Sequence, residues 1–573
     1  MAAIILNEGG MDATTSCGIL CSMFRCWMAA ALSLARSCLG RNGLVVLALL
    51  ALVLAAARCG GEAGPSPETT PLPSPVPWQG PPPIDLAETD PDLTLFGGDA
   101  DDYLADRFSL AQGDFNGDGI ADILVGAPKA DGPDNTRRDA GEAYVIFGSA
   151  DIDGEVDMGK GQQDFTVIGA GDSDNLGFVV ASGDVNGDGI DDILVGARFA
   201  RGPDDSRGNG GEVNVVFGSP TLGGTVDTAL DEQDFTIAGA EGGDYLGCAL
   251  AAGDVNGDGI DDIITAAPGA DGPDDSRPNG GEAYVVFGSP TLSGTVDTAL
   301  DEQDFTIAGA EGEDFLANFA ASGDVNGDGI DDILLGTHMA DGPDNQRRDA
   351  GEAYVILGAS DLEGTLDLAS GKGFLTIWGA DVNDWLGFYL IAADVNGDGP
   401  DDLIVGARNA DGLNNARNNC GEVYLIFGSA NLPSTLDMAQ EPQDVTLIGA
   451  NQGDLFGHSL AAGDINGDGL ADVLVGAPTA GAAAIGRYKV GEIFGFFSSD
   501  QWPATVDAAL GKHDVAILGA ETEDELGFSL ASGDVNGDGI ADVIGGAFLA
   551  DGPKNARLDG GEAYVFLSEQ QGE

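Results

Sequence analysis

Seven short acidic segments of this 573-residue chain have the residue types and the spacing of a cation-binding loop. Each has aspartate at its first, fifth and ninth positions, asparagine at the third and glycine at the sixth, as in the segment from Asp114 to Asp122. Alternate side chains of such a loop direct their oxygens toward one point, the glycine allows a sharp turn, and the seventh residue offers its carbonyl. Flexible ligation by oxygen alone suits Ca²⁺ better than Mg²⁺, which requires tighter octahedral geometry.

The loops therefore predict up to seven calcium sites with five ligand residues each. An Asx turn that needs no metal is the alternative, but three carboxylates in each of seven loops would repel one another without cations. Pro400 is compatible with a site because the seventh position contributes only its carbonyl. The predicted ligands are Asp114, Asn116, Asp118, Ile120 and Asp122; Asp184, Asn186, Asp188, Ile190 and Asp192; Asp254, Asn256, Asp258, Ile260 and Asp262; Asp324, Asn326, Asp328, Ile330 and Asp332; Asp394, Asn396, Asp398, Pro400 and Asp402; Asp464, Asn466, Asp468, Leu470 and Asp472; and Asp534, Asn536, Asp538, Ile540 and Asp542.

The loops recur every 70 residues, from Asp114 to Asp534. Each repeat contains four strand-forming segments separated by turn signals, typified by SLASGD, DILVGA, GEAYVVFG and DFTIAGA. Four short strands per repeat are the content of one propeller blade. A solenoid of stacked repeats is the structural alternative.

The two ends of the repeat region favour a closed ring. A copy of the outer strand, Leu93 to Phe96, precedes the first inner strand, whereas the last repeat ends after Phe566 without an outer strand of its own. Pairing these two segments completes the last blade and removes open sheet edges. We therefore predict an all-β fold over residues 91–573, a seven-bladed β-propeller of four-stranded blades closed by the N-terminal strand.

The phrases LGFSLASGDVNGDGIADVIGGA and GGEAYVF resemble the FG-GAP repeats of the integrin alpha-subunit head. The resemblance extends from Asp92 to about Leu567. It implies seven blades, structural calcium loops on the lower face and ligand binding on the upper face. All seven loops have a complete ligand set here, and nothing resembles an inserted ligand-binding domain, legs or a membrane span, so the resemblance does not imply a heterodimeric receptor.

The composition is strongly acidic, with 96 Asp and Glu against 23 Lys and Arg and a net charge of -73. Such a surface repels nucleic acid and anionic lipid, and it attracts divalent cations or basic ligands. Five of the seven cysteines precede the repeats, and the other two, Cys248 and Cys420, occupy different positions in non-adjacent repeats. We therefore expect no disulfide within the propeller.

Residues 1–59 are expected to be an N-terminal extension and signal peptide, and residues 60–90 a Pro-rich linker. The apolar run from Leu44 to Ala57 follows Arg36 and Arg41 and ends in three alanines, as a secretory signal does. A retained signal anchor is one alternative. Lipid attachment at Cys59 is another, although Arg58 departs from the lipoprotein pattern.

A second charged pattern repeats with the blades. Seven arginines each lie five residues before a glutamate of the series that runs from Glu142 to Glu562. We expect a blade-stabilising ion pair or loop clamp, with a ring of anion-binding arginines as the alternative. The arginines are Arg137, Arg207, Arg277, Arg347, Arg417, Arg487 and Arg557.

The loops opposite the predicted calcium sites differ between repeats. Variation on a repeated scaffold is typical of a ligand surface, with aromatic side chains as anchors, although neutral drift among duplicated repeats explains it equally well. The candidate ligand-binding residues are Arg198, Phe199, Tyr245, Phe315, His338, Trp385 and Arg408.

No catalytic residue is predicted. The three histidines, His338, His458 and His513, lie at unrelated repeat positions, and the chain has no GxSxG, HExxH or phosphate-loop motif. By its resemblance we expect a non-enzymatic, calcium-binding adhesion module, secreted or at the cell surface or in the periplasm, that binds an extracellular protein. The alternatives are a calcium-dependent lectin for a glycan ligand and a polysaccharide-degrading enzyme. Nucleic acid is not an expected partner, and membrane association is expected only through an N-terminal lipid or signal anchor.

Overall fold

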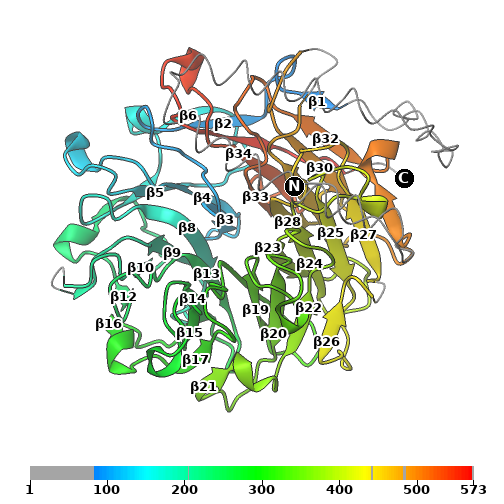
Figure 1. Ribbon diagram of the computed structural model, residues 1–573. Coiled ribbons are helices and arrows are strands. Elements are labelled where there is room, and N and C mark those ends of the chain that lie inside the picture. The colour runs from blue at the N-terminus through cyan, green and yellow to red at the C-terminus, as the bar shows by residue number, and fades with distance from the viewer. Residues whose placement is uncertain (1–82, 204–205, 441–442, 482–485, 571–573) are drawn as a thin grey trace, which may run out of the picture. The chain divides into compact units, whose positions relative to one another are not determined.

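The repeats form seven β-sheets arranged in a ring, in a computed structural model that describes residues 83–203, 206–440, 443–481 and 486–570 (Figure 1). The predicted all-β propeller with seven blades is thereby confirmed. The predicted signal peptide, Cys59 and most of the Pro-rich linker lie outside the described residues. Within the described residues, no helix has the length and apolar character needed to cross a membrane.

Each sheet runs from the ring axis outward, and its last strand comes from another repeat. The seven sheets, blade by blade, are β3 (Leu110–Gly113), β4 (Asp122–Ala127), β5 (Glu142–Ile146), β7 (Phe165–Ile168) and β11 (Gly224–Asp227); β8 (Leu176–Gly183), β9 (Asp192–Ala197), β10 (Glu212–Val216), β12 (Phe235–Ala238) and β16 (Gly294–Asp297); β13 (Ala249–Gly253), β14 (Asp262–Ala267), β15 (Glu282–Val286), β17 (Phe305–Ala308) and β21 (Gly364–Asp367); β18 (Phe319–Gly323), β19 (Asp332–Thr337), β20 (Glu352–Ile356), β22 (Leu375–Trp378) and β26 (Thr435–Asp437); β23 (Leu386–Ala393), β24 (Asp402–Ala407), β25 (Glu422–Ile426), β27 (Val445–Ile448) and β31 (Thr505–Asp507); β28 (Ser459–Gly463), β29 (Asp472–Ala477), β30 (Glu492–Phe496), β32 (Val515–Leu518) and β1 (Ile84–Asp85); and β33 (Ser529–Gly533), β34 (Asp542–Ala547), β35 (Glu562–Phe566), β2 (Leu93–Phe96) and β6 (Gly154–Asp157).

The sheets have five strands rather than the predicted four. In the first blade the fifth strand, β11, pairs in parallel with β7, in the register Gly224 to Phe165. Its sequence GTVD is mostly exposed and lacks the apolar pattern of a buried strand. The extra strand was therefore missed because backbone pairing along the outer edge of the preceding blade, and not burial, holds it extended.

The burial pattern explains why the remaining strands form. The second strand of the first blade, β4, is buried at all six positions, because each of its faces is covered by a neighbouring blade. The inner strands are rich in alanine, glycine and serine because they crowd around the axis. A Cβ at Gly183, for example, would lie 2.6 Å from the Cβ of Ala252 in the next blade.

The N-terminal segment closes the ring, as predicted. Strand β2 pairs antiparallel with β35 and supplies the missing outer strand of the last blade. Strand β6 of the first repeat then pairs in parallel with β2. Strand β1, at the end of the segment predicted as a linker, pairs in parallel with β32 of the sixth blade. Three consecutive blades are thus tied together at the junction.

Antiparallel pairing places successive loops on alternate faces of the ring. The loops between the first and second strands of the blades form what we call the lower face, and the loops that follow the second and fourth strands form the upper face. Short 3₁₀ helices lie in the upper loops: η1 (Pro133–Asn135), η5 (Pro273–Asp275), η7 (Pro343–Asn345), η9 (Leu413–Asn415) and η12 (Pro553–Asn555). Others follow the outermost strands: η2 (Met158–Lys160), η4 (Thr228–Leu230), η6 (Thr298–Leu300), η8 (Leu368–Ser370) and η11 (Ala508–Leu510). Cys248 and Cys420 are both free thiols, as predicted.

Candidate functional site

The predicted calcium loops on the lower face have one shared geometry, seen in the first blade. The carboxylate of Asp114 accepts the backbone N–H groups of Asp118 at 3.0 Å and Gly119 at 2.8 Å. The Asp118 carboxylate accepts the N–H of Ile120. Gly119 has φ +88°, a left-handed conformation that favours glycine. The first and fifth aspartates therefore shape the loop around its glycine.

The ninth residue of each loop is buried at the start of the second strand. Asp122 is fully buried, and its carboxylate accepts the N–H groups of Phe115 at 3.0 Å and Gly148 at 2.8 Å and the side-chain amide of Asn116 at 3.2 Å. The pKa of Asp122 is raised to about 7, mainly by burial and also by the nearby carboxylates of Asp118 and Asp114. This carboxylate joins the loop to two strands of its blade.

The loops have the donor chemistry of a calcium site, with three carboxylates, one amide and one carbonyl in each. In the structure these oxygens accept hydrogen bonds from the loop itself. Within the part of the chain that the structure describes, no group of three or more Asp, Glu, His or Cys side chains is arranged to hold a metal ion. Calcium binding by the 35 residues named above stays a prediction.

The seventh residue of each loop has a second role, in packing. The side chain of Ile190 reaches the loop of the preceding blade, where a Cβ at Gly117 would lie 3.0 Å from its Cδ1. Ile120 makes the equivalent contact with Gly537 across the ring closure, and Pro400 with Gly327. The lower loops are therefore packed against one another around the ring.

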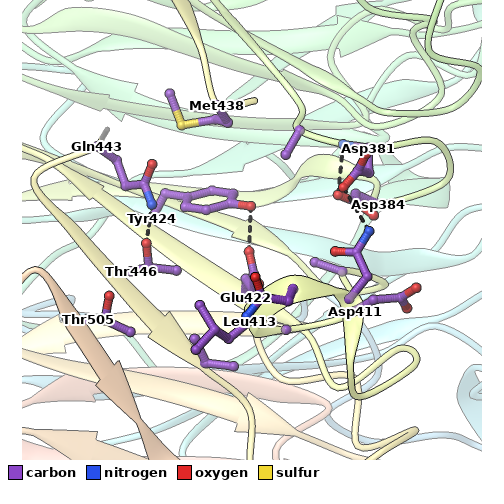
Figure 2. Close-up of a pocket in the computed structure, with 16 residues that line it drawn as sticks. Asp381, Asp384, Asp411, Leu413, Glu422, Tyr424, Met438, Gln443, Thr446 and Thr505 are labelled. Atoms are coloured by element: carbon purple, nitrogen blue, oxygen red, sulfur yellow. Dashed lines mark hydrogen bonds between the residues drawn. The ribbon is translucent and has the colours of Figure 1, made fainter. Parts of the chain in front are cut away.

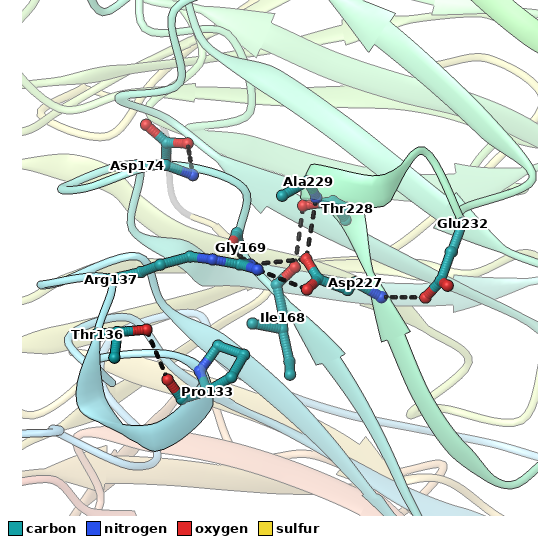
Figure 3. A network of polar contacts seen from close by, with 11 residues as sticks. Pro133, Thr136, Arg137, Ile168, Gly169, Asp174, Asp227, Thr228, Ala229 and Glu232 are labelled. Carbon is teal, nitrogen blue, oxygen red and sulfur yellow. Dashed lines mark hydrogen bonds and ion pairs between the residues drawn. The ribbon is translucent and has the colours of Figure 1, made fainter.

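The seven repeated arginines on the upper face link neighbouring blades. In Figure 3, Arg137 forms two hydrogen bonds of 2.6 Å with the carboxylate of Asp227 and one of 2.9 Å with the carbonyl of Gly169. Asp227 ends the strand that the next repeat adds to this blade. The Arg137 guanidinium lowers the pKa of Asp227. The expected clamp is present, but its partner is an aspartate of the next repeat, not the glutamate five residues after the arginine.

The same clamp recurs at every blade boundary. The pairs are Arg137–Asp227, Arg207–Asp297, Arg277–Asp367, Arg347–Asp437, Arg417–Asp507, Arg487–Asp85 and Arg557–Asp157. The last two cross the ring closure. The 70-residue recurrence of aspartate from Asp157 to Asp507 was the sequence signal that could have identified the partners.

The glutamates instead line acidic pockets between blades, one of which is shown in Figure 2. There the hydroxyl of Tyr424 donates a 2.6 Å hydrogen bond to Glu422. Burial raises the pKa of the nearby Asp384 to about 7. A pocket in the second blade has the same position and is lined by Asp174, Glu212 and Asn214. Each of these two pockets thus contains the repeated glutamate of its blade.

The upper end of the ring axis carries a different kind of site. Around it lies a cluster of cationic and aromatic side chains, several of which lie in or next to the inner strands β3, β8, β23 and β28. Figure 1 shows these strands near the centre of the ring. We call it the axial cluster; its members are Arg107, Phe108, Phe178, Arg198, His338, Trp385, Phe388, Arg408 and His458.

Arginines stack on aromatic rings throughout the axial cluster. The guanidinium carbon of Arg198 lies 3.5 Å from the ring centre of Phe178, and that of Arg408 lies 3.7 Å from Phe388. Arg107 lies 5.2 Å from the same Phe388 ring. Such contacts stabilise a cation held away from water.

Four of the seven predicted ligand residues, Arg198, His338, Trp385 and Arg408, belong to the axial cluster. Phe199 and Tyr245 form an adjoining edge-to-face pair, with ring centres 5.7 Å apart, beside Arg198. Phe315 is half-buried, and the aromatic contacts of the described residues do not link it to this group.

Sequence reasoning missed Arg107, Phe108, Phe178, Phe388 and His458. Phe178 and Phe388 directly follow the repeated Leu-Gly, a position that gave no sign of a binding role. The first repeat reads Leu104-Ala-Asp-Arg-Phe108, two residues longer than the Leu-Gly-Phe of other repeats. That insertion was the available signal for Arg107.

Comparisons with known proteins match the repeats. A model of the FG-GAP repeat matches residues 108–146, 176–216, 247–286, 317–356 and 456–494. Human phosphatidylinositol-glycan-specific phospholipase D is 28% identical over 303 residues, which are 51% of this chain and 33% of that protein. Integrin alpha pat-2 of Caenorhabditis briggsae is 32% identical over 254 residues, 42% of this chain and 18% of that protein.

The phospholipase D of Bos taurus is 36% identical over 172 residues, 30% of this chain and 19% of that protein. The chain therefore matches at most a third of the length of these three relatives. Proteins named as an enzyme and proteins named as integrin alpha chains both share the repeats.

Proposed function

The chain belongs to the FG-GAP repeat family of seven-bladed β-propellers, and on this premise we propose that it is an extracellular or surface-displayed binding module that recognises a protein partner through its upper face. The observation that carries the proposal is the contrast between the two faces. The lower loops repeat one sequence, whereas the upper loops differ and surround the axial cluster. The matched integrin alpha chains favour adhesion as the biological setting.

The upper face also exposes large apolar side chains that a partner could cover. They lie in loops that follow the second and fourth strands, and they are 38 to 62% exposed. Apolar side chains that gather on one face of a soluble domain are typical of an interaction surface. They are Met339, Val382, Leu413, Tyr488 and Leu558.

Calcium at the seven lower loops is part of the proposal. The 35 predicted residues would hold Ca²⁺ through their carboxylate, amide and carbonyl oxygens. The bound ion would neutralise the loop carboxylates, and the loops themselves would position the blades. Calcium would therefore support the binding face without touching the ligand.

The lectin alternative depends on aromatic rings free to stack on sugars. Tyr245, Phe315 and Trp385 are half-buried, and Trp385 already stacks with Arg408 at 4.7 Å. This arrangement favours a protein ligand over a glycan. Hydrolysis of a phosphatidylinositol-glycan is the alternative suggested by the names of the phospholipase relatives.

The test is a binding screen of the full chain against extracellular matrix proteins and a glycan array, with about 2 mM Ca²⁺, within the range of extracellular sites. We expect a protein partner whose binding is weakened by Tyr488→Ser and Leu558→Ser. Leu357→Ser is the matched control, because Leu357 is 46% exposed in a loop of the lower face. Equal loss in the control, binding only to glycans, or turnover of a phosphatidylinositol-glycan anchor would overturn the proposal.

A further inference from the structure

The three arginines of the axial cluster lack the carboxylate partners that the other buried arginines have. Each clamp arginine is paired with an aspartate, with five of the seven ion pairs between 2.6 and 2.7 Å. Across the described residues, Arg107, Arg198 and Arg408 form no such ion pair, and the Nε atom of each is buried without a hydrogen-bond partner. In a chain with 96 acidic and 23 basic residues, leaving three arginines unpaired is a marked exception.

The contacts of these arginines supply little negative charge. Arg408 is hydrogen bonded to Nδ1 of His458 at 2.8 Å, and Arg198 lies beside the thiol of Cys248. Burial lowers the pKa of His338 to about 3 and that of His458 as well, so both rings are neutral. Burial also raises the pKa of Cys248 to about 11.

One carboxylate, that of Asp106, faces the cluster. Its Oδ1 accepts the backbone N–H of Arg107 at 2.7 Å, and its charge acts on both Arg107 and Arg198. Lys129 is nearby and is directed toward Asp139 and Asn175. One carboxylate against three guanidinium groups leaves the site positive. Burying unmatched positive charge costs stability unless an anion compensates for it.

A small, partly open cavity lies between these groups. It has a volume of about 70 Å³ and is lined by Arg107, Arg198, Asn318, His338 and four apolar or thiol side chains. A single water needs roughly 10–15 Å³ measured in this way. The cavity therefore has room for one small polyatomic ion or one terminal acidic group and little more.

We propose that the axial cavity binds one oxyanionic group, a carboxylate, sulfate or phosphate, which Arg107 and Arg198 hold and Arg408 stabilises by its charge. The planar guanidinium fork matches two oxygens of such a group. The aromatic rings exclude water and strengthen the attraction. The inference extends the proposed function to the chemistry of its ligand, but free ions can test it without any partner.

The first test measures the melting temperature of the full chain in sodium acetate, sulfate and phosphate, each against sodium chloride at equal ionic strength. We expect at least one oxyanion to raise the melting temperature until the effect reaches a plateau at high anion concentration. Comparing acetate with sulfate and phosphate shows whether the site prefers a planar or a tetrahedral group. Arg107→Gln and Arg198→Gln should each weaken the apparent affinity by about tenfold, the loss of one charge-assisted contact.

Arg138→Gln is the matched control, because the side chain of Arg138 is 83% exposed and the charge change is the same. It should keep the affinity of the native chain. Responses identical to chloride for all three anions, or an equal loss in the Arg138 variant, would refute the site.

A second measurement avoids variants that fail to fold. Crystals of the unmodified chain soaked in selenate should give an anomalous peak inside the axial cavity. Selenate peaks confined to the outer surface would refute the proposal. If anion binding is found while no protein partner is, the proposed function fails and the axial site remains.

Discussion

The lower loops and the axial cluster both take residues from several blades, yet only the loops keep the same residues in every blade. The lower loops present aspartate, asparagine and glycine at fixed positions from Asp114 to Asp542. At the axis, one position carries Phe108, Phe178, Cys248, Asn318, Phe388, His458 and Phe528 in turn. A closed ring is stabilised when every pair of neighbouring blades makes the same contacts. A single ligand on the axis touches all blades at once, so the residues that bind it need not be the same in each blade. The repeated parts therefore support the fold, and the unrepeated part is the candidate for recognition.

Calcium removal should lower the melting temperature more than any of the changes below, and it should do so by emptying the lower loops and not the axial site. At millimolar Ca²⁺, a site with extracellular affinity adds about 1 kcal/mol, so seven sites add several. Calorimetry of the full chain in Ca²⁺ and after EDTA should show a large fall in melting temperature. Mg²⁺ should restore little of it. An unchanged melting temperature in EDTA would contradict calcium binding by the lower loops.

Breaking one clamp should give the next largest effect. Arg137→Gln removes the cation that pairs with Asp227, and we expect a loss of about 1–3 kcal/mol in urea denaturation at pH 7. The folded-state pKa of Asp227 is lowered, so this stabilisation is present above pH 4 and is lost as the pH falls below it. Below this pH, the difference in stability between the Arg137 variant and the native chain should become smaller. A loss as large in the exposed Arg138→Gln variant would contradict the clamp.

Removing an axial arginine should change the free energy of unfolding in the opposite direction from removing a clamp arginine. Arg408→Met keeps much of the stacking on Phe388 and deletes a buried charge that lacks a carboxylate partner. In the absence of oxyanions we expect unchanged stability or a gain of up to about 1 kcal/mol. A destabilisation equal to that of Arg137→Gln in the same urea titration would show that the axial arginines also belong to the scaffold.

The smallest effect is expected in one of the two blades that depart from the repeated glutamate–tyrosine pair. In the sixth blade Phe494 replaces the tyrosine, and burial raises the pKa of Glu492 to about 8. Because the folded state favours the protonated acid, stability should fall as the pH rises from about 4.5 to 8. Glu492→Gln should reduce this fall in thermal melts, whereas the exposed Glu88→Gln should not. If the melting temperatures of the native chain and the Glu492 variant change with pH in the same way, Glu492 is not the cause of the fall in stability.

Much of the scaffold could be predicted from local residue patterns along the chain. The 70-residue period, the apolar second strand and the extra copy of the outer strand at Leu93 to Phe96 predicted the blades and the closure. The clamp arginines were also recognised, and a blade-stabilising ion pair or loop clamp was expected of them. Their partners were not identified because Arg137 and Asp227 are 90 residues apart and meet only when strand β11 of the next repeat pairs with the first blade.

The sequence by itself determined the repeat, the number of blades and the chemistry available in each loop, because these depend on local residue patterns that recur. The tertiary structure decided which of the varying residues meet on the axis. Arg198 and Arg408 occupy one repeat position, which His338 shares, but Arg107 lies in the insertion of the first repeat, so the 70-residue period does not link all three arginines. The inner strands bring them together because every blade directs the same end of its first strand to one axis, where seven dissimilar residues become neighbours.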